Sequence, residues 1–167
     1  NVLIDKDAAY VANGNVLFRV KSFKNYGILS ERIIQEQDSG SRVDVETYKE
    51  DPNDFTLWKP STDDEPGWES PWGLGRPGWH LECSVMSEIV LGVPFDIHGG
   101  GNDLKFPHHD NEIAQTCAYH SNESAESFAK YWFHNGFLNL DDEKMSKSLG
   151  NVVYIDDLKK NFKGNEI

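Results

Sequence analysis

The sequence predicts an α/β domain, and three observations in its second half support that prediction. Apolar residues recur on one helical face from about Trp79 to Leu91, and Gly92 ends the pattern as a helix stop. The next residues, 93–97, form a short apolar run that is typical of a buried strand. Three consecutive glycines and a second helical pattern follow, so helix, strand, glycine-rich turn and helix succeed one another as they do in α/β sheets.

The first zone of the chain, residues 1–59, begins with a predicted β-hairpin. The pair Asn13-Gly14 lies between apolar runs at residues 8–12 and 16–20. Asn-Gly between two such runs is the strongest short-range hairpin signal, because both residues tolerate the positive φ angles of a tight turn.

Less regular structure is expected between this hairpin and the second half. Ser30 is expected to cap a short helix at residues 31–37, and the polar residues 38–54 after it are expected to be irregular. Residues 60–78 contain three prolines after Pro60, several glycines and two tryptophans. That composition predicts a connecting loop that packs on its surroundings through the tryptophans.

The remaining zone, residues 79–167, is the most regular. Its first helix is expected to turn an apolar stripe toward the core, namely Leu81, Val85, Met86, Ile89 and Val90. The elements expected after the strand at residues 93–97 are, in order, a tight turn at residues 99–101, a helix from Pro107 to about Tyr119, a strand at residues 131–133, its hairpin partner at residues 137–140, and a short helix capped by Asp156.

Composition and charge limit the classes of protein to which the chain can belong. It has 167 residues, with no apolar run of roughly 18 residues and no signal segment at its start. Two cysteines cannot form a disulfide framework, so a cytoplasmic protein without a membrane span is expected. The net charge of −12 argues against binding of nucleic acid by bulk electrostatics, because phosphate contacts need clustered lysine and arginine.

A candidate metal site lies at the start of the second helix. His108 and Glu112 are four residues apart and therefore share one helical face. An imidazole nitrogen and a carboxylate oxygen so placed suit one zinc ion, at roughly 2.0–2.2 Å each, and a thiolate from Cys83 could complete the set. Spacing alone also allows an exposed His–Glu pair, with Cys83 as core filler. The glycines at residues 99–101 favour a site, because they let the backbone approach a ligand closely.

Two further histidines are candidates. His98 ends a predicted strand beside the glycines, where open α/β sheets bind their ligands. A hydrogen-bonded structural histidine at a strand end is an equally good interpretation of His98. His80 is expected to be structural.

The loop at residues 144–150 is a second candidate site. Lys144 and Lys147 are three residues apart and can converge on one anion, with the hydroxyl of Ser146 beside them. Ammonium groups directed at a phosphate stabilise the transition state of nucleotidyl transfer, and Gly150 gives the loop freedom to close. The alternative is a solvated surface loop of lysines and serines.

Several stretches carry a family resemblance. Residues 144–148 spell KMSKS, which is the second signature motif of class I aminoacyl-tRNA synthetases. The stretches that resemble the cysteine-specific branch of that class are GRPGWHLEC at residues 75–83, HGGGNDL at 98–104, FPHHDNE at 106–112 and HNGF at 134–137, while DFTLWK at 54–59 resembles its connective insertion. The resemblance covers nearly the whole chain and is densest between Trp58 and Asn151.

The resemblance implies both a fold and an activity. The chain would hold the second half of a Rossmann-type catalytic domain at residues 79–167, a connector at 60–78 and part of the connective insertion at 1–59. The implied reaction is ATP-dependent activation of cysteine to cysteinyl-adenylate, with magnesium accompanying ATP, and transfer of the cysteinyl group to tRNA-Cys.

The same resemblance implies roles for single residues. The family holds a zinc ion with two cysteines, a histidine and a glutamate, and Cys83, His108 and Glu112 match three of these ligands. Trp79 and His98 match positions that line the cysteine pocket. Lys144 and Lys147 match catalytic positions, and the positions implied for ATP binding are Lys147, Lys144, Ser146, Gly99, Gly101 and Asp103.

Some family features do not occur in this sequence. They are the first signature, of the HIGH type, the N-terminal cysteine that supplies the fourth zinc ligand, and the anticodon-binding helices. The chain is therefore expected to be a piece of a longer enzyme and to be unable to activate cysteine alone. Two other functions stay open: the cysteine ligase of mycothiol biosynthesis, and a non-catalytic zinc-binding module. The Asn111-Glu112 pair and the insertion argue against the first, and the intact lysine loop argues against the second.

Overall fold

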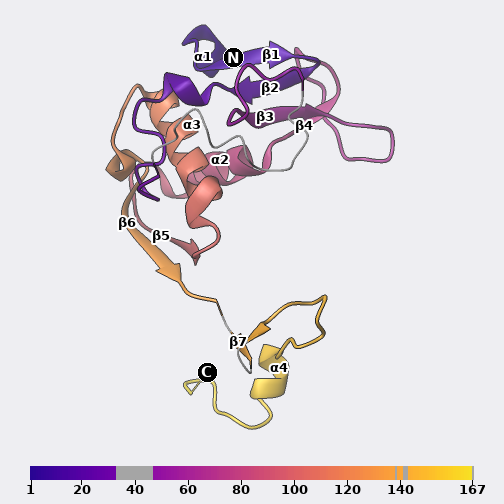
Figure 1. Cartoon of the computed structure of the whole chain (residues 1–167), viewed down its shortest axis with the longest axis vertical. Helices are drawn as coiled ribbons and strands as arrows, with labels where there is room; N and C mark the ends of the chain where they lie inside the picture. The colour runs from indigo at the N-terminus through magenta and orange to yellow at the C-terminus, as the bar shows by residue number, and fades with distance from the viewer. Residues whose placement is uncertain (33–46, 138, 141–142, 167) are drawn as a thin grey trace. The chain divides into compact units, whose positions relative to one another are not determined.

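The computed structural model describes residues 1–32, 47–137, 139–140 and 143–166. These residues belong to two compact units, Asn1–His134 and Asn135–Ile167 (Figure 1). Both units combine helices and strands, so the fold is a mixture of α and β elements.

The first unit opens with a short helix, α1 (Val2–Asp5), and a four-stranded sheet in the order β1-β2-β3-β4. Strands β1 (Ala9–Ala12) and β2 (Asn15–Phe18) are antiparallel across Asn13 and Gly14, whose φ angles are 49° and 75°. The predicted hairpin is thus confirmed. Strand β3 (Phe55–Pro60) pairs with β2, and β4 (Gly75–Pro77) pairs with β3.

The stretch predicted as a connecting loop, residues 60–78, ends in the edge strand β4. Proline is tolerated at such an edge because it need not donate a backbone hydrogen bond there. At Gly78 the chain passes so close to β3 that an added Cβ would lie 2.0 Å from the backbone oxygen of Thr56. Gly78 therefore allows the next helix to start directly against the sheet.

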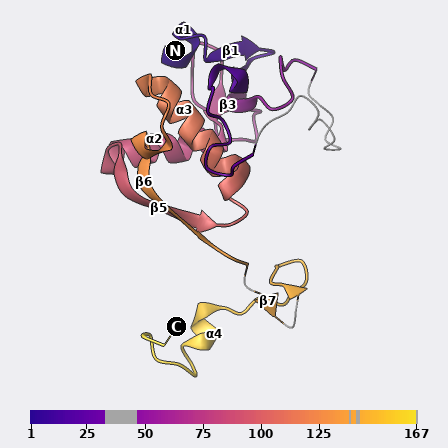
Figure 2. The same cartoon turned by 60° about the vertical axis from the view of Figure 1, so that its left-hand side comes forward.

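Two helices follow the sheet. Helix α2 (Trp79–Leu91) has the predicted bounds and ends at Gly92, whose φ is 76°. Helix α3 (Asp110–His120) is largely buried and packs on α2. Figures 1 and 2 show both helices between the N-terminal sheet and a second, two-stranded sheet made of β5 (Phe95–Gly101) and β6 (Ala129–Asn135).

The core of the first unit is centred on α3. Ile113, Ala114 and Cys117 of this helix are 0% exposed. Phe18 and Phe55 stack at 4.9 Å on the side of the N-terminal sheet, and Phe95 meets Phe128 edge to face at 5.1 Å near β5. Helix α3 thus lies at the centre of a core to which both sheets contribute. Its N-terminal turn is therefore held in place by the packing around it.

The predicted burial of the α2 stripe is wrong for most of its residues. Leu81 packs against the core, but Val85, Met86, Ile89 and Val90 are exposed, Ile89 to 78%. The polar Ser84 is the buried residue of α2, because it lies against α3. Among the described residues, the side of α2 that faces α3 is therefore polar, and the apolar side lies at the surface.

Two local predictions near the candidate site also fail. The glycines at residues 99–101 do not turn, because β5 continues through them and Gly99 passes β6 closely, where an added Cβ would lie 3.4 Å from Phe133 O. Pro107 does not start a regular helix. It lies in an irregular helical turn, Lys105–His109, in which Phe106 is extended, as is favoured before proline.

The second unit is small. Strand β7 (Asn139–Leu140) pairs with β8 (Glu143–Lys144), so the predicted pairing of residues 137–140 with the strand at residues 131–133 is wrong for the described residues. Helix α4 (Ile155–Leu158) is capped by Tyr154, so the predicted Asp156 cap is wrong by two residues. None of the helices seen in the described ranges is long and apolar enough to span a membrane.

The described residues include only the start of one predicted helix. The helix predicted at residues 31–37 falls mainly outside the described residues, as do residues 38–46 of the irregular stretch. Glu31 itself has a φ of 59°, which is not helical.

A buried carboxylate fixes the N-terminal sheet, and its removal is expected to destabilise the first unit. Asp54 is 1% exposed and accepts hydrogen bonds from Tyr10 Oη at 2.7 Å, Val20 N at 2.9 Å and Asp51 N at 3.1 Å. We expect Asp54→Ala to lower the free energy of unfolding by about 3 kcal/mol, because several donors lose their partner at once. Urea unfolding measures this loss, and the exposed Asp63→Ala is the control, with an expected change within about 0.5 kcal/mol. An equal effect of both substitutions would contradict this role of Asp54.

Candidate metal centre

The candidate ligands converge where α2 crosses the start of α3. Cys83 lies on α2, His108 in the turn before α3 and Glu112 in the first turn of α3. Helical spacing places His108 and Glu112 on one face, and the packing of α2 on α3 brings Cys83 to them. The ligand atoms of the three residues all lie within 4.8 Å of one another.

Burial decides between the two interpretations that spacing left open. The side chains of His108 and Glu112 are 6% and 0% exposed, and His108 Nε2 lies 3.0 Å from Glu112 Oε1. An exposed helical ion pair is therefore excluded. Cys83 is only half-buried, unlike Cys117 in the core, so it is not core filler.

The charges in the cluster suit a cation. Burial raises the pKa of Glu112, but the neighbouring imidazoles of His108 and His98 outweigh it and lower the pKa to about 2. Burial, together with the nearby Glu112 charge, raises the pKa of the Cys83 thiol to about 11. Without a metal the carboxylate is therefore charged and the thiol is protonated, so metal binding would release the thiol proton.

The donor set fits zinc. One sulfur, one imidazole nitrogen and one carboxylate oxygen are ligands that zinc accepts together, and three protein ligands leave a position for a further group. Glu112 Oε1 is buried and has no hydrogen-bond partner among the residues that the structure describes. A buried acceptor of this kind is costly unless a cation or donor satisfies it.

His80, expected to be structural, contacts the candidate ligand His108. Their Nδ1 atoms lie 2.8 Å apart, and burial lowers the pKa of His80 to about 4. The Nδ1 atom of a neutral His80 can accept a hydrogen bond from His108 Nδ1–H, which leaves the lone pair of His108 Nε2 available for a metal. Trp79 stacks on both rings, with its centroid 4.2 Å from that of His108 and 5.4 Å from that of His80, and is itself 59% exposed.

A second group of ligands shares Glu112. His98 Nε2 lies 2.7 Å from Glu112 Oε2, and the ligand atoms of His98, His109 and Glu112 also lie within 4.8 Å of one another. His109 in turn shares a hydrogen bond with His134, from Nδ1 to Nε2 at 2.8 Å. Sequence spacing gave no sign of His109 or His134, because adjacent helical residues do not share a face and β6 meets α3 only in the folded chain.

The glycines and Asp103 lie beside this second group. An added Cβ at Gly100 would lie 3.0 Å from His109 Cε1, so glycine allows β5 to approach the histidine. At Gly101 an added Cβ would lie 2.5 Å from Asp103 Oδ1. Gly99, Gly101 and Asp103 thus form the end of β5 and the turn after it.

The lysine loop belongs to the second unit. Lys144 lies in β8, and Lys147 is exposed in the turn that ends at Gly150, whose φ is 67°. Ser146 fixes the turn: its backbone N–H donates to Asn151 Oδ1 at 2.8 Å, and its Oγ accepts from Leu149 N at 3.3 Å. The Lys147 side chain thus extends from a hydrogen-bonded turn.

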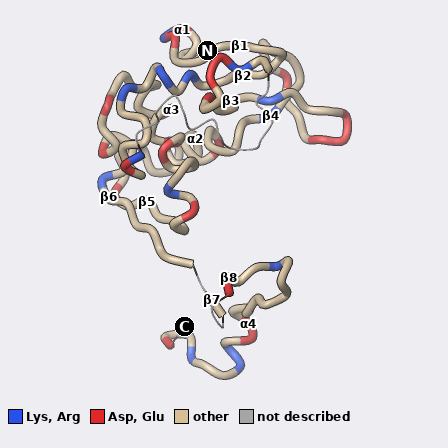
Figure 3. Tube along the Cα trace, viewed as in Figure 1, with Lys and Arg blue, Asp and Glu red and all other residues tan. Residues whose placement is uncertain are grey.

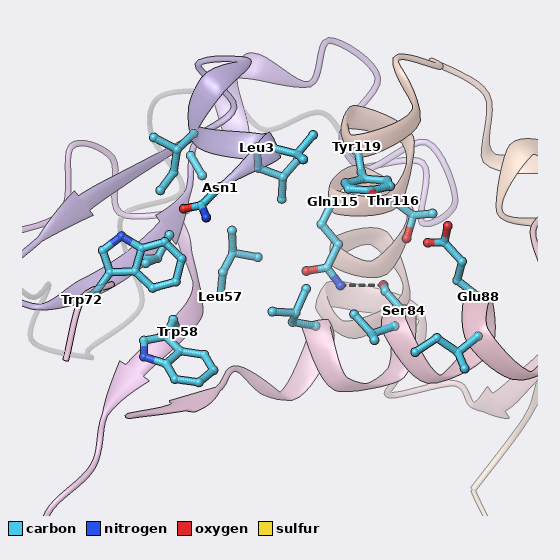
Figure 4. Close-up of a pocket in the computed structure, with 17 residues that line it drawn as sticks. Asn1, Leu3, Leu57, Trp58, Trp72, Ser84, Glu88, Gln115, Thr116 and Tyr119 are labelled. Carbon is cyan, nitrogen blue, oxygen red and sulfur yellow. Dashed lines mark hydrogen bonds between the residues drawn. The ribbon is translucent and has the colours of Figure 1, made fainter. Parts of the chain in front are cut away.

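A separate pocket of about 450 Å³ lies among α1, β3, α2 and α3 (Figure 4). Its lining is mainly apolar and includes Leu57 and Trp58, with Gln115 donating to Ser84 Oγ at 2.6 Å. None of the candidate metal ligands lines it.

Comparison with known proteins identifies the family. The class I (C) tRNA synthetase catalytic domain matches residues 1–167. The chain belongs to this family. Its three candidate ligands, the glycines of β5 and the lysine loop therefore belong to a synthetase catalytic domain.

Similar proteins from several bacteria are cysteine–tRNA ligases. The ligase of Phenylobacterium zucineum is 58% identical over 163 residues, which are 97% of this chain and 35% of the relative. That of Saccharophagus degradans is 57% identical over 166 residues, or 99% of this chain and 35% of the relative. That of Paramagnetospirillum magneticum is 59% identical over 157 residues, or 93% of this chain and 33% of the relative. The chain thus spans about a third of the length of these relatives.

Proposed function

We propose that this chain is the part of a cysteine–tRNA ligase that recognises the thiol of cysteine. The convergence of Cys83, His108 and Glu112 in a family whose similar members are cysteine–tRNA ligases carries the proposal. A zinc site that selects a thiol explains why a cysteine, a histidine and a glutamate converge here, whereas packing alone does not.

The proposed site separates cysteine from serine by the chemistry of the bound metal. A zinc ion held by Cys83, His108 and Glu112 would bind the substrate thiolate, for which a serine hydroxyl is a poor substitute. A bonding group that the wrong substrate lacks gives discrimination of roughly 10⁴ or more. Trp79, which covers His108, and His98, beside Glu112, would bound the amino-acid pocket.

The residues that the resemblance implies for nucleotide binding fall in two stretches of the sequence, the end of β5 and the lysine loop. Gly99 and Gly101 would let the backbone approach ATP, with Asp103 beside them. Lys144 and Lys147, with Ser146, would neutralise phosphate charge as the adenylate forms and pyrophosphate leaves, with magnesium bound to ATP. These roles follow the family resemblance of the residues.

Within a complete ligase, residues 79–167 would form the second half of the catalytic domain, residues 60–78 a connector and residues 1–59 part of the connective insertion. tRNA-Cys would then bind mainly elsewhere, because this chain has a net charge of −12. Figure 3 shows acidic residues at the tip of the loop between β3 and β4, where Asp63, Asp64 and Glu65 follow one another. An anionic backbone would avoid that loop.

A hybrid enzyme tests the proposed function. This chain would replace the matching segment of the Phenylobacterium zucineum ligase, which makes up 35% of that protein. We expect the hybrid to catalyse ATP–pyrophosphate exchange with cysteine and not with serine, and to charge tRNA-Cys. A folded, zinc-loaded hybrid that shows no exchange with cysteine, or exchanges equally with serine, would contradict the proposal.

A further inference from the structure

The carboxylate of Glu112 lies between two histidines. Oε1 lies 3.0 Å from His108 Nε2, and Oε2 lies 2.7 Å from His98 Nε2. Glu112 is completely buried, so no solvent competes for either oxygen. The hydrogen bond between His98 and Oε2 therefore fixes the direction in which the carboxylate points.

His98 is itself fixed by the second sheet. It lies on β5, and its ring meets Trp132 edge to face at 4.9 Å and Phe95 at 5.4 Å. The side chain is 18% exposed. A ring packed against side chains of both β5 and β6 can hold Glu112 in place from outside helix α3.

A ligand that is held by an outer partner binds a metal more tightly, because its orientation is fixed before the metal arrives. With Oε2 occupied by His98, Oε1 is the oxygen on the side of His108 and is the one without a hydrogen bond. Because it lies 3.0 Å from the ligand atom of His108, it is the oxygen best placed to complete the set with Cys83 and His108.

We propose that His98 is a positioning residue, which holds Glu112 Oε2 so that Oε1 is presented to the metal. This role rests on the proposed zinc site and adds to it, because the resemblance implied only that His98 lines the amino-acid pocket. His98 would thus act on the substrate through Glu112 and the metal.

The competing arrangement is a metal bound by His98, His109 and Glu112, in which His98 would be a ligand. The two arrangements differ in whether a sulfur atom is among the metal ligands. Only the group that contains Cys83 supplies a thiolate, and a thiolate bound to Co²⁺ produces a ligand-to-metal charge-transfer band in the near ultraviolet. Cobalt therefore reports which group holds the ion.

The experiment titrates the metal-free chain with Co²⁺ and, in competition with a chelating dye, with Zn²⁺. The variants are His98→Ala, which removes the donor, and His98→Gln, whose amide N–H can replace His98 Nε2. His120→Gln is the matched control, because His120 pairs with Glu88 at the surface, outside both groups of candidate ligands. Thermal unfolding of each variant shows whether the fold is retained.

We expect His98→Ala to weaken metal binding about 10–100-fold, with His98→Gln recovering most of the loss. The charge-transfer band at saturating Co²⁺ should be unchanged in every variant. Wild-type affinity in His98→Ala would overturn the positioning role and leave the Cys83 site standing. A wild-type chain that binds Co²⁺ without a thiolate band would overturn the positioning role, because the ion would then be bound outside the group that contains Cys83. A wild-type chain that binds neither metal would show that Cys83, His108 and Glu112 do not form a metal site by themselves, and would overturn this role together with that site.

Discussion

Cys83→Ala is expected to abolish stoichiometric zinc binding by the chain while leaving the fold intact. Cys83 supplies the sulfur ligand of the group, and the remaining histidine and carboxylate are too few for a stable zinc site. Cys83 is half-buried and lies outside the core, so its truncation should cost little stability. Metal analysis of the protein purified with and without added zinc measures the effect.

The second cysteine provides the control for this substitution. Cys117 is 0% exposed and donates through Sγ to Ser124 O at 3.2 Å, a bond that Cys117→Ser can keep. Cys117→Ser should therefore retain one zinc per chain. Retention of zinc in Cys83→Ala would mean that the ion is held by residues other than the proposed set.

Lys147→Ala is expected to lower cysteine-dependent ATP–pyrophosphate exchange in the hybrid enzyme by about 100-fold or more. A positive group aimed at the charge that develops during the reaction typically contributes this much when it is removed. The turn around Lys147 is built by Ser146 and Gly150, so the substitution should leave the backbone of the loop unchanged. Exchange kinetics with and without the substitution measure the loss.

Lys160→Ala serves as the comparison for Lys147→Ala. Lys160 is an exposed lysine of the same unit, and it pairs with Asp157 at 2.6 Å. We expect this variant to have the activity of the unsubstituted hybrid, and both variants to keep their zinc. Equal activities of the Lys147 and Lys160 variants would show that Lys147 has no catalytic role.

The parts of the site that depend on local spacing could be predicted from the sequence. The shared face of His108 and Glu112 follows from helical periodicity, and the hairpin at Asn13 and Gly14 follows from turn chemistry. The approach of Cys83 was a weaker prediction, because it depends on the packing of α2 against α3.

Features that depend on contacts distant in sequence could not be predicted from it. The pairing of His98 with Glu112 requires β5 to lie beside α3, and the pairing of His109 with His134 requires β6 to do so. For the same reason the α2 stripe was misjudged. Periodicity showed that α2 has an apolar side, but could not show that α3 would cover the polar Ser84 instead.

X-ray absorption at the zinc edge of the zinc-loaded chain tests the central claim most directly, because the two candidate groups of ligands differ by one sulfur. A zinc ion held by Cys83, His108 and Glu112 should show one sulfur at about 2.3 Å, together with nitrogen and oxygen ligands at about 2.0–2.2 Å. A zinc ion surrounded by nitrogen and oxygen alone would contradict the claim.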